Sequence, residues 1–473
     1  MQPNGKSPFV WIFPRGEAIR NFAYSGALDE LQAKCGCAVL SVKPNEEIWE
    51  YLARRSDKLR PLEEFKERYP VRILREVLDI AHGRWLWSEA ARERWRLRDL
   101  EAVTASQKVK RWGKKIAVAP LCNRAGLSLL AKAERAASRM LSPTRHYLDL
   151  FREWRPSVVF NASHVHSRNA IQAVQSAQWL GIPTATFIFS WDNLTSQGRV
   201  LPPYDYYLVW NQALKEQLLG IYPFVKPQQV FVTGTPQFDA HFRPENYWSR
   251  EQFCCRVGAD YARPIVLYTT GMPNHMPGEE EIVEGIADTL EELTEFGPPQ
   301  LLVRVYAKDR SGRFEPLKRR RPDILFPVVP WEANWLTPLP EDLPLWTNTL
   351  RHCALGINVA STVSLELCMF DKPVLNVGYN PPSIPPAQLR YLRYYSFDHY
   401  RYVVETGAVE VARHLETLRD LIKRAIEYPS ALSKLRQRLL KAMFDETLDG
   451  HSAKRTAEVL LQLTKLRSSR AKP

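Results

Sequence analysis

The stretch GINVASTVSLELCMFDKPVLNVGY, from Gly356 to Tyr379, decides how this chain folds. Its apolar beginning predicts a strand over residues 355–359, and its apolar end predicts a second strand over residues 374–377. Between them, apolar residues recur at the spacing of one buried helix face until residues 371–373, where the proline ends the helix. A strand–helix–strand unit of this kind builds a parallel sheet.

The turn between the first strand and the helix carries candidate binding residues. Ser361 or Thr362 can cap the helix, and the N–H groups of its first turn favour an anion such as a phosphate. Glu366 lies about one turn further along, where its carboxylate could accept hydrogen bonds from sugar hydroxyls. The same residues are also compatible with a capped core helix and a solvated glutamate.

Length, composition and charge narrow the class of protein. A chain of 473 residues is long for a single core and indicates two domains, and 45% hydrophobic residues exclude a disordered protein. The formal net charge of +13 and a pI of about 9.3 predict an acidic partner. Nucleotides, phosphorylated lipids, anionic membrane surfaces and nucleic acids all fit that charge.

Cysteine usage and hydropathy indicate the compartment. The seven cysteines include no C-x-x-C pair, so they predict neither a zinc site nor a disulfide framework, and a reducing cytosol is the simplest compartment. No apolar run approaches the length of a signal-peptide core or a membrane span. We therefore expect a cytoplasmic protein that is soluble or at most peripheral to a membrane.

Predicted strands and helices alternate along most of the chain, which is typical of the α/β class. We predict two doubly wound, Rossmann-like domains, with a further strand over residues 324–329 in the second. The predicted parts are an N-terminal domain (1–240) with a basic helical insert at about 50–150, a linker (241–263), a C-terminal domain (264–430), and terminal helices with a basic tail (431–473).

The insert differs from the rest of the chain in charge and aromatic content. From Tyr51 to Lys115 it has 18 Lys and Arg against 10 Asp and Glu, a net charge of +8. One interpretation is that its tryptophans pack inward behind a solvated basic face; the other is that they sit on an anionic membrane surface. The tryptophans concerned are Trp85, Trp87, Trp95 and Trp112.

The N-terminal strand over residues 9–13 is followed by a predicted loop that extends to Gly26. Open α/β sheets bind ligands beyond the carboxyl ends of their strands, so residues in this loop are candidate substrate contacts. The candidates are Arg15, Asn21 and Tyr24, and a solvated loop without a binding role is the alternative.

Three short stretches together resemble a known group of enzymes. They are Trp191-Asp192-Asn193-Leu194-Thr195-Ser196, Thr233-Gly234-Thr235-Pro236-Gln237-Phe238-Asp239 and Asn358-Val359-Ala360-Ser361-Thr362. The combination resembles nucleotide-sugar glycosyltransferases of the GT-B fold. More narrowly, it is similar to surface-polysaccharide transferases related to CDP-glycerol glycerophosphotransferases and UDP-N-acetylglucosamine 2-epimerases. The resemblance covers about residues 155–380.

The resemblance implies a donor site in the second domain, an acceptor site in the first, and a reaction in the cleft between them. It assigns the donor diphosphate to Ser361 and Thr362, and the ribose hydroxyls to Glu366. It implies no metal and no cofactor beyond the sugar nucleotide itself. The remaining site residues are Thr270, Gly271 and Arg304 for the donor, and Arg15, Asn21, Tyr24 and Asn193 for the acceptor.

Two departures from the resemblance bear on the reaction. Arg304 is followed by Val305 and Tyr306, where glycerophosphotransferases tend to have Arg-x-His. Asn358, separated from Glu366 by seven residues, replaces the first carboxylate of the Glu-x7-Glu pattern of many retaining GT-B enzymes. The first departure counts against glycerophosphate transfer, and the second counts against a retaining reaction. We therefore expect an inverting sugar transfer.

An inverting transfer needs a general base for the acceptor hydroxyl. The candidates, all just beyond predicted strand ends of the first domain, are Asp192, His164 and His166. Asp192 could instead cap the turn that follows it, and each histidine could be a loop or core residue.

The sequence thus predicts a metal-independent glycosyltransferase of cell-surface polysaccharide biosynthesis. Its expected partners are a nucleotide-sugar donor and a glycan or lipid-linked glycan acceptor, with contact to the inner face of an anionic membrane. A 2-epimerase-type isomerase and a glycerophosphotransferase are the alternatives. We do not expect nucleic acid as a partner, since no nucleic-acid-binding module is evident.

Overall fold

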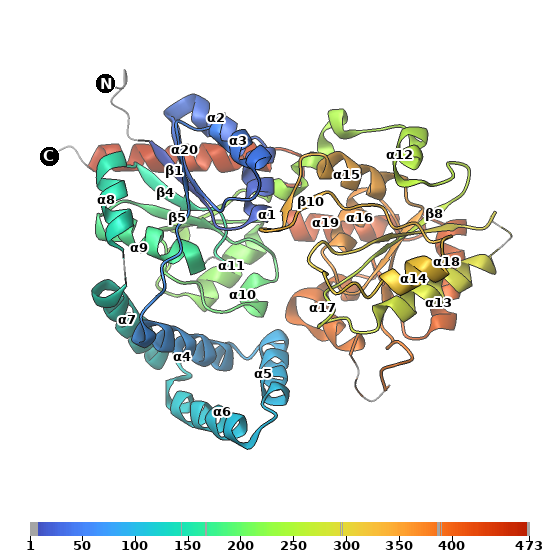
Figure 1. Cartoon of the computed structure of the whole chain (residues 1–473), viewed down its shortest axis with the longest axis horizontal. Helices are drawn as coiled ribbons and strands as arrows, with labels where there is room; N and C mark the ends of the chain where they lie inside the picture. The colour runs from blue at the N-terminus through green and yellow to red at the C-terminus, as the bar shows by residue number, and fades with distance from the viewer. Residues whose placement is uncertain are drawn as a thin grey trace. The chain divides into compact units, whose positions relative to one another are not determined.

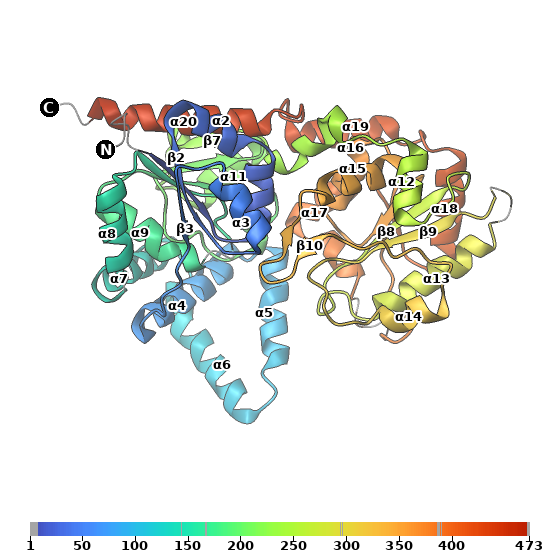
Figure 2. The same ribbon diagram turned by 45° about the horizontal axis from the view of Figure 1, so that its top comes forward.

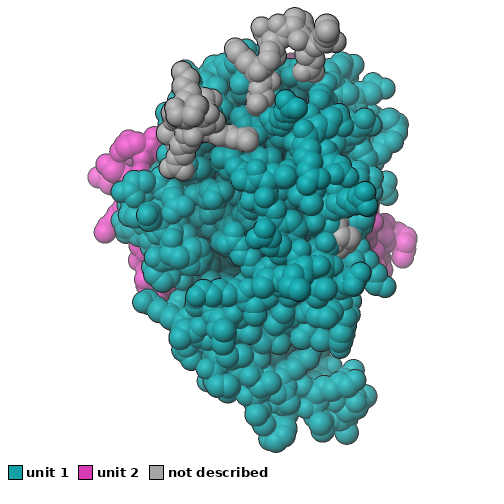
Figure 3. All heavy atoms as spheres, turned by 90° about the vertical axis from the view of Figure 1, so that its left-hand side faces the viewer, with its two compact units in different colours: residues 1–237, 333–337, 451–473 teal, residues 238–332, 338–450 magenta. Residues whose placement is uncertain are grey.

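The chain forms two compact units, each built around its own parallel sheet (Figure 1). The two units are coloured separately in Figure 3; unit 1 is Met1–Gln237, Ala333–Thr337 and His451–Pro473, and unit 2 is Phe238–Glu332 and Pro338–Gly450. The computed structural model describes residues 8–142, 144–165, 168–293, 295, 297–385, 388 and 390–470.

Unit 1 is built on a seven-stranded sheet in the order β3-β2-β1-β4-β5-β6-β7, with every neighbouring pair parallel. All five residues of β1, FVWIF, are buried, as expected for a strand covered on both faces. The strands are β1 (Phe9–Phe13), β2 (Cys37–Ser41), β3 (Lys58–Pro61), β4 (Val158–Asn161), β5 (Thr184–Phe187), β6 (Tyr206–Val209) and β7 (Val230–Val232).

Helices connect the strands of unit 1, and α20 packs against α2 although the two are far apart in the sequence. A π-helical turn, Arg20–Tyr24, follows α1 directly. The helices outside the insert are α1 (Gly16–Ile19), α2 (Ala27–Cys35), α3 (Glu46–Ala53), α8 (Arg145–Trp154), α9 (Ile171–Trp179), α10 (Asn193–Ser196), α11 (Gln212–Ile221) and α20 (Ser452–Arg470).

The predicted insert is helical (Figure 2). It carries a small apolar cluster of its own. Trp85 and Trp95 pack against this cluster, whereas Trp112 is 66% exposed. The inward-packing interpretation therefore holds for Trp85 and Trp95 and not for Trp112. The helices of the insert are α4 (Tyr69–Leu86), α5 (Glu89–Glu101), α6 (Ala105–Val118) and α7 (Arg124–Leu141).

Unit 2 is built on a five-stranded parallel sheet in the order β14-β13-β12-β8-β9. The strand–helix–strand unit predicted from Gly356–Tyr379 is β12, α16 and β13, with β12 and β13 paired in parallel. The strands are β8 (Ile265–Thr269), β9 (Gln300–Arg304), β12 (Leu355–Asn358), β13 (Val374–Val377) and β14 (Glu410–Ala412), and the short β10 (Trp331–Glu332) lies outside this sheet.

The helices of unit 2 include α12, which lies within the segment 241–263 that was expected to be a linker. Of the terminal helices, α18 and α19 pack within unit 2. The helices are α12 (Arg250–Val257), α13 (Glu279–Glu291), α14 (Glu315–Arg320), α15 (Asp342–His352), α16 (Val363–Met369), α17 (Asp398–Glu405), α18 (Leu415–Glu427) and α19 (Ser433–Phe444).

Two local predictions differ from the structure. Residues 324–329 do not form a strand: only Leu325 bridges to Leu302, because Pro327 and Pro330 lack the N–H groups that a longer ladder needs. The loop expected between Arg15 and Gly26 is helical over most of its length. Among the described residues, no helix is both long and apolar enough to cross a membrane.

Candidate functional site

The strand order of unit 2 locates its candidate site. The chain begins the sheet at β8, adds β9 on one side, and then adds β12, β13 and β14 on the other side. The direction of winding therefore changes between β8 and β12, and parallel α/β sheets bind ligands beyond the carboxyl ends of the strands at such a point. The segments at that place are Thr269–Gly271 after β8 and Asn358–Thr362 after β12.

The turn from β12 to α16 is held by its own side chains. Asn358 is fully buried, and its Oδ1 accepts hydrogen bonds from the backbone N–H of Ser361 at 3.2 Å and from Ser364 Oγ at 3.0 Å. Ala360 adopts a φ of +42°, a left-handed conformation that is unfavourable for residues other than glycine. Such strain is concentrated at functional turns.

The capping group at this turn is Ser361. Its Oγ accepts the N–H of Val363 at 3.2 Å, and its carbonyl accepts the N–H of Ser364 at 3.0 Å. Thr362 occupies the N-cap position without a hydrogen bond from its side chain to the helix. The N–H groups of Val363 and Ser364, which were expected to be available to a phosphate, are therefore hydrogen-bonded within the turn.

Glu366, on α16, is the one carboxylate among the predicted donor residues, and hydrogen bonds constrain it. Its Oε1 accepts hydrogen bonds from His241 Nε2 at 3.0 Å and from Trp346 Nε1 at 2.8 Å. The side chain of Glu366 is 12% exposed, and no described residue donates a hydrogen bond to its other oxygen, Oε2. One carboxylate oxygen is thus fixed in place and the other is left open.

His241 is itself held from behind. Its Nδ1 lies 3.0 Å from Thr347 Oγ1, and its side chain is only 3% exposed. A ring that donates from Nε2 to Glu366 has Nδ1 available to accept a hydrogen bond from the Thr347 hydroxyl. This arrangement fixes both the ring and the carboxylate that it contacts.

Arg304, at the end of β9, is part of the same network. Its Nη2 donates to both carboxylate oxygens of Asp342, at 2.7 and 2.9 Å, and Trp331 Nε1 donates to Asp342 Oδ2 at 2.7 Å. The Arg304 guanidinium also lies over the Trp346 ring, 4.7 Å from the centroid. Arg304 was predicted to supply positive charge to the site, but the carboxylate of Asp342 balances that charge. Arg304 is connected to Glu366 through the ring of Trp346, which contacts both residues.

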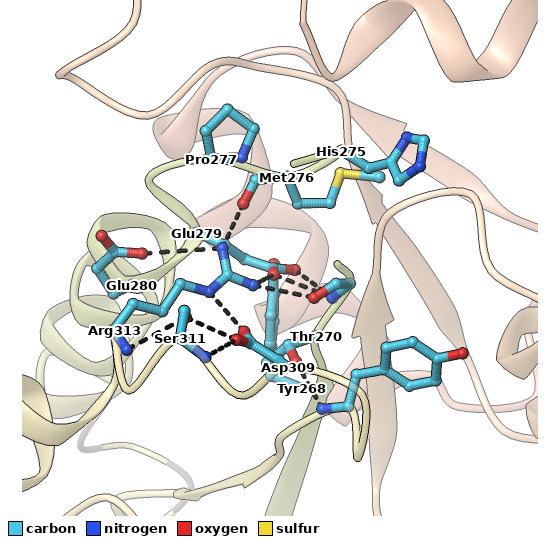
Figure 4. Close-up of polar contacts among 12 residues, drawn as sticks. Tyr268, Thr270, His275, Met276, Pro277, Glu279, Glu280, Asp309, Ser311 and Arg313 are labelled. Atoms are coloured by element: carbon cyan, nitrogen blue, oxygen red, sulfur yellow. Dashed lines mark hydrogen bonds and ion pairs between the residues drawn. The ribbon is translucent and has the colours of Figure 1, made fainter. Parts of the chain in front are cut away.

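The Thr269–Gly271 segment is anchored by a buried acidic group (Figure 4). The Gly271 N–H donates to Glu279 Oε2 at 2.9 Å, and Thr270 Oγ1 accepts the N–H of Tyr306 at 2.8 Å. A Cβ on Gly271 would lie 2.6 Å from Cγ of Met276, so a larger residue here would displace the Met276 side chain. Thr270 and Gly271 were predicted to approach phosphates, and the backbone N–H of Gly271 is already bonded.

Glu279 is fully buried and lies in a cluster of charges (Figure 4). Arg313 donates from Nη2 to Glu279 Oε2 at 2.7 Å and from Nε to Asp309 Oδ2 at 2.7 Å, while Tyr268 donates its hydroxyl to Glu279 Oε1 at 3.0 Å. Burial raises the pKa of Glu279 to about 7, although Arg313 and the Gly271 N–H act in the opposite direction. The cluster connects the loop after β8 to α13 and to Arg313.

Unit 1 has its own change of winding direction, between β1 and β4. Arg15 follows β1; its Nε donates to Glu17 Oε2 at 2.8 Å, and its guanidinium lies 4.9 Å from the centroid of Phe189. Asn21 is completely buried and Tyr24 is 6% exposed, because both belong to the π-helical turn and not to an open loop. Of these three predicted acceptor contacts, only Arg15 keeps part of its side chain at the surface of unit 1.

The predicted catalytic residues follow β4 and β5. His164 is 8% exposed, and its Nδ1 lies 3.1 Å from the carbonyl oxygen of Phe187. Asp192 is half-buried and accepts hydrogen bonds from the Ser196 hydroxyl and from Asn193 Nδ2, so its side chain does not cap the backbone of the turn. Asn193 Oδ1 accepts the N–H of Ser190 instead. His166 lies outside the described residues.

Sequence reasoning singled out Glu366 and Arg304 but missed Trp346, which contacts both, and His241, which contacts Glu366. His241 stands two positions after the Thr233–Asp239 stretch, and Trp346 lies in α15, outside the three motifs. In the described part of the chain, no group of three or more His, Cys, Asp or Glu residues is placed to hold a metal ion.

Comparison with known proteins establishes the fold. No family model matches the sequence, and no curated protein does either. Solved structures match over nearly the whole chain. UDP-GlcNAc 2-epimerase from Neisseria meningitidis, bound to UDP-GlcNAc, is 14% identical with a TM-score of 0.52, and the match covers 96% of this chain and 99% of that one.

Two further structures agree. UDP-GlcNAc 2-epimerase from Methanocaldococcus jannaschii is 13% identical with a TM-score of 0.52, covering 96% of this chain and 99% of that one. S. aureus MnaA with UDP is 13% identical with a TM-score of 0.53, covering 97% of both chains. The chain therefore has the two-part, Rossmann-like GT-B fold, which confirms the fold predicted from its sequence.

Proposed function

We propose that unit 2 binds a nucleoside diphosphate sugar and that the protein is a glycosyltransferase. The observation that carries this proposal is the state of Glu366, which has one oxygen held by His241 and Trp346 and the other open. It stands on the helix that follows β12, beside the change of winding direction where such sheets bind ligands. A nucleotide is also one of the acidic partners that fit the net charge of +13.

The chemistry of Glu366 suits a ribose. A carboxylate accepts hydrogen bonds only, and the adjacent 2′- and 3′-hydroxyls of a ribose are donors at short separation. Because the carboxylate is already oriented, binding does not have to restrict its rotation, and such preorganisation strengthens binding. We assign the ribose to Glu366 Oε2.

The hydroxyls of Ser361 and Thr362, at the start of the same helix, are assigned to the diphosphate. Both residues are half-exposed, and the positive end of the helix dipole favours an anion at this place. Ser361 Oγ accepts the N–H of Val363 and can still donate its own O–H to a phosphate oxygen, so the hydrogen bond within the turn is compatible with this assignment. Arg304 is assigned to ordering Trp346, and Thr270 and Gly271 to shaping the opposite side of the nucleotide site.

In the proposed reaction, an acceptor hydroxyl attacks the anomeric carbon of the donor sugar and inverts its configuration. The bond to the departing nucleoside diphosphate breaks, and that group takes the electron pair. Asp192 takes the hydroxyl proton; its half-buried carboxylate is an acceptor on an edge where open sheets bind ligands. The reaction as proposed requires neither a metal ion nor a further cofactor.

The proposed acceptor is a glycan or lipid-linked glycan of cell-surface polysaccharide biosynthesis. Its support is the basic, Trp-containing insert of unit 1, which suits a substrate presented at an anionic membrane surface. The corresponding location is the cytoplasm, with peripheral contact to the inner face of the membrane. Arg15 and Asn193 are the assigned acceptor contacts that lie nearest to strand ends of unit 1.

A 2-epimerase is the second candidate, favoured by the solved structures of that name that match nearly the whole chain. The two functions differ in whether an acceptor is needed. The purified protein is incubated with UDP-N-acetylglucosamine alone, and the sugar is followed by proton NMR. A transferase leaves the configuration at C2 unchanged. Accumulation of the C2 epimer would establish the isomerase and contradict the transferase.

A further inference from the structure

Helix α6 of the insert presents an apolar stripe to solvent. Val109 is 67% exposed, Trp112 66% and Ile116 52%. Their spacing of three and four residues puts them on one side of the helix, and we call these three residues the α6 stripe. Figures 1 and 2 agree in showing α6 at the end of unit 1 farthest from its sheet, and it belongs to the lower end of the teal unit in Figure 3.

A different side of α6 attaches the helix to the rest of the insert. Arg111 Nε and Lys115 Nζ donate to the carboxylate of Asp99 on α5, at 2.9 and 2.7 Å, and both cations lie over the ring of Trp95. Val118 is the only residue of α6 that is buried, and it joins the apolar cluster of the insert. The α6 stripe therefore contributes little to packing within unit 1.

The apolar surface continues beyond α6. Leu100, in the last turn of α5, is 58% exposed, and Val103, in the connection to α6, is 74% exposed. Isolated exposed apolar residues are ordinary on protein surfaces, but a contiguous group of large ones marks an interaction site. Five such residues occur here within 17 positions of the chain, from Leu100 to Ile116.

Basic residues predominate along the chain around the stripe. From Ala102 to Ala133 the sequence contains no Asp or Glu and seven Lys or Arg. Lys108 and Lys110, which flank Val109 along the helix, are exposed, and neither forms an ion pair with a described residue. A surface that combines aliphatic and indole side chains with unpaired lysines is complementary to a layer that is apolar inside and anionic at its face.

We propose that the α6 stripe docks the protein onto an anionic lipid surface. Trp112 enters the interface between head groups and acyl chains, where indole rings are favoured, with Val109 and Ile116 beside it. The lysines reach outward to the lipid phosphates. Valine and isoleucine offer no ring on which a base could stack, so nucleic acid fits the stripe less well. A second copy of this chain fits no better, because its own stripe carries the same positive charge.

The test is flotation of the full chain with vesicles, without nucleotide, so that its result is independent of the donor site. We expect binding to vesicles that mix phosphatidylglycerol with phosphatidylcholine and little binding to phosphatidylcholine alone. The triple variant V109S/W112S/I116S should bind the anionic vesicles at least about ten-fold more weakly. The double variant K108Q/K110Q should weaken binding by roughly five-fold per lysine removed.

The matched control removes three exposed apolar side chains of unit 2, in the variant Y261S/V328S/Y428S, and should bind as the unaltered protein does. Circular dichroism of all variants should be unchanged, since none of the replaced residues is buried. Equal binding of the V109S/W112S/I116S variant, or no binding of the unaltered protein to anionic vesicles, would overturn the proposal. Salt-sensitive binding to single-stranded RNA in place of vesicles would assign the basic surface to nucleic acid instead.

Discussion

The glutamate at position 366 illustrates what residue types and spacing disclose. Its place one turn into a helix after a buried strand was sufficient to single it out. Its partners were not foreseeable, because His241 and Trp346 approach it across 125 and 20 positions of the chain. A local pattern shows which groups are chemically suited to a role, but only the folded chain shows which groups hold them.

Removing the support of Glu366 should weaken nucleotide binding without removing the carboxylate. In the variant His241→Ala, the carboxylate loses one of its two donors and gains rotational freedom. We expect affinity for the preferred nucleoside diphosphate to fall about ten-fold, which corresponds to about 1–2 kcal/mol for a hydrogen bond to a charged group. Isothermal titration calorimetry measures it directly.

His414→Ala is the control for that experiment, because His414 is an exposed histidine of the same unit. The control should bind as tightly as the unaltered protein. If His241→Ala bound the nucleotide as tightly as the control, the role assigned to His241 would be wrong.

Among the elements, the strand–helix–strand segment of β12, α16 and β13 was predicted because the periodicity of its apolar residues is local and strong. The network beneath it was not: Ser364 Oγ lies 2.7 Å from the Tyr400 hydroxyl, which donates to Asn376 Oδ1 at 2.8 Å. The same limit applies to the segment 324–329, where an apolar run suggested a strand and Pro327 interrupts the ladder. The periodicity of apolar residues indicates which face of an element is buried. It does not indicate which residues of other elements contact that face.

The loop after β8 gives a prediction about pH. Burial raises the pKa of Glu279 from 4.5 to about 7, so between these values the folded protein holds a proton that the unfolded chain has lost. The contribution of this group to stability is therefore complete below about pH 4.5 and is lost as the pH rises through 7. The slope in that window is up to about 1.4 kcal/mol per pH unit.

Urea unfolding at a series of pH values from 5 to 8 measures this slope. The variant Glu279→Gln cannot titrate at this position, so its free energy of unfolding should fall less steeply with pH than that of the unaltered protein. Parallel curves for the two proteins would show that Glu279 stays ionised in the folded state, and the assigned direction of its pKa shift would be incorrect.

At the scale of the whole molecule, regular alternation of strands and helices was enough to predict two doubly wound units. The return of α20 to unit 1 was not predictable, since the sequence left open whether the terminal helices pack on one half or bridge both. Its apolar residues have the spacing of a helix face, and many surfaces could bury such a face. The structure shows that the surface is α2, near the beginning of the chain.

This long-range contact should contribute substantially to the stability of unit 1. Leu460 of α20 is fully buried, so Leu460→Ala should lower the free energy of unfolding by about 2–4 kcal/mol through lost burial and the cavity left behind. Leu461→Ala, at the neighbouring half-exposed position, should cost clearly less. Equal effects in urea unfolding would mean that α20 does not pack as described.

The most direct test of the donor site is a thermal-shift screen with UDP, GDP, CDP, dTDP and CMP in the absence of metal. A ligand that binds only the folded protein raises its melting temperature. We predict that one nucleoside diphosphate stabilises the unaltered protein and the control Glu245→Ala, which alters an exposed glutamate of unit 2, but not Glu366→Ala. No response to any nucleotide, or an undiminished response of Glu366→Ala, would contradict the assignment of the nucleotide to Glu366.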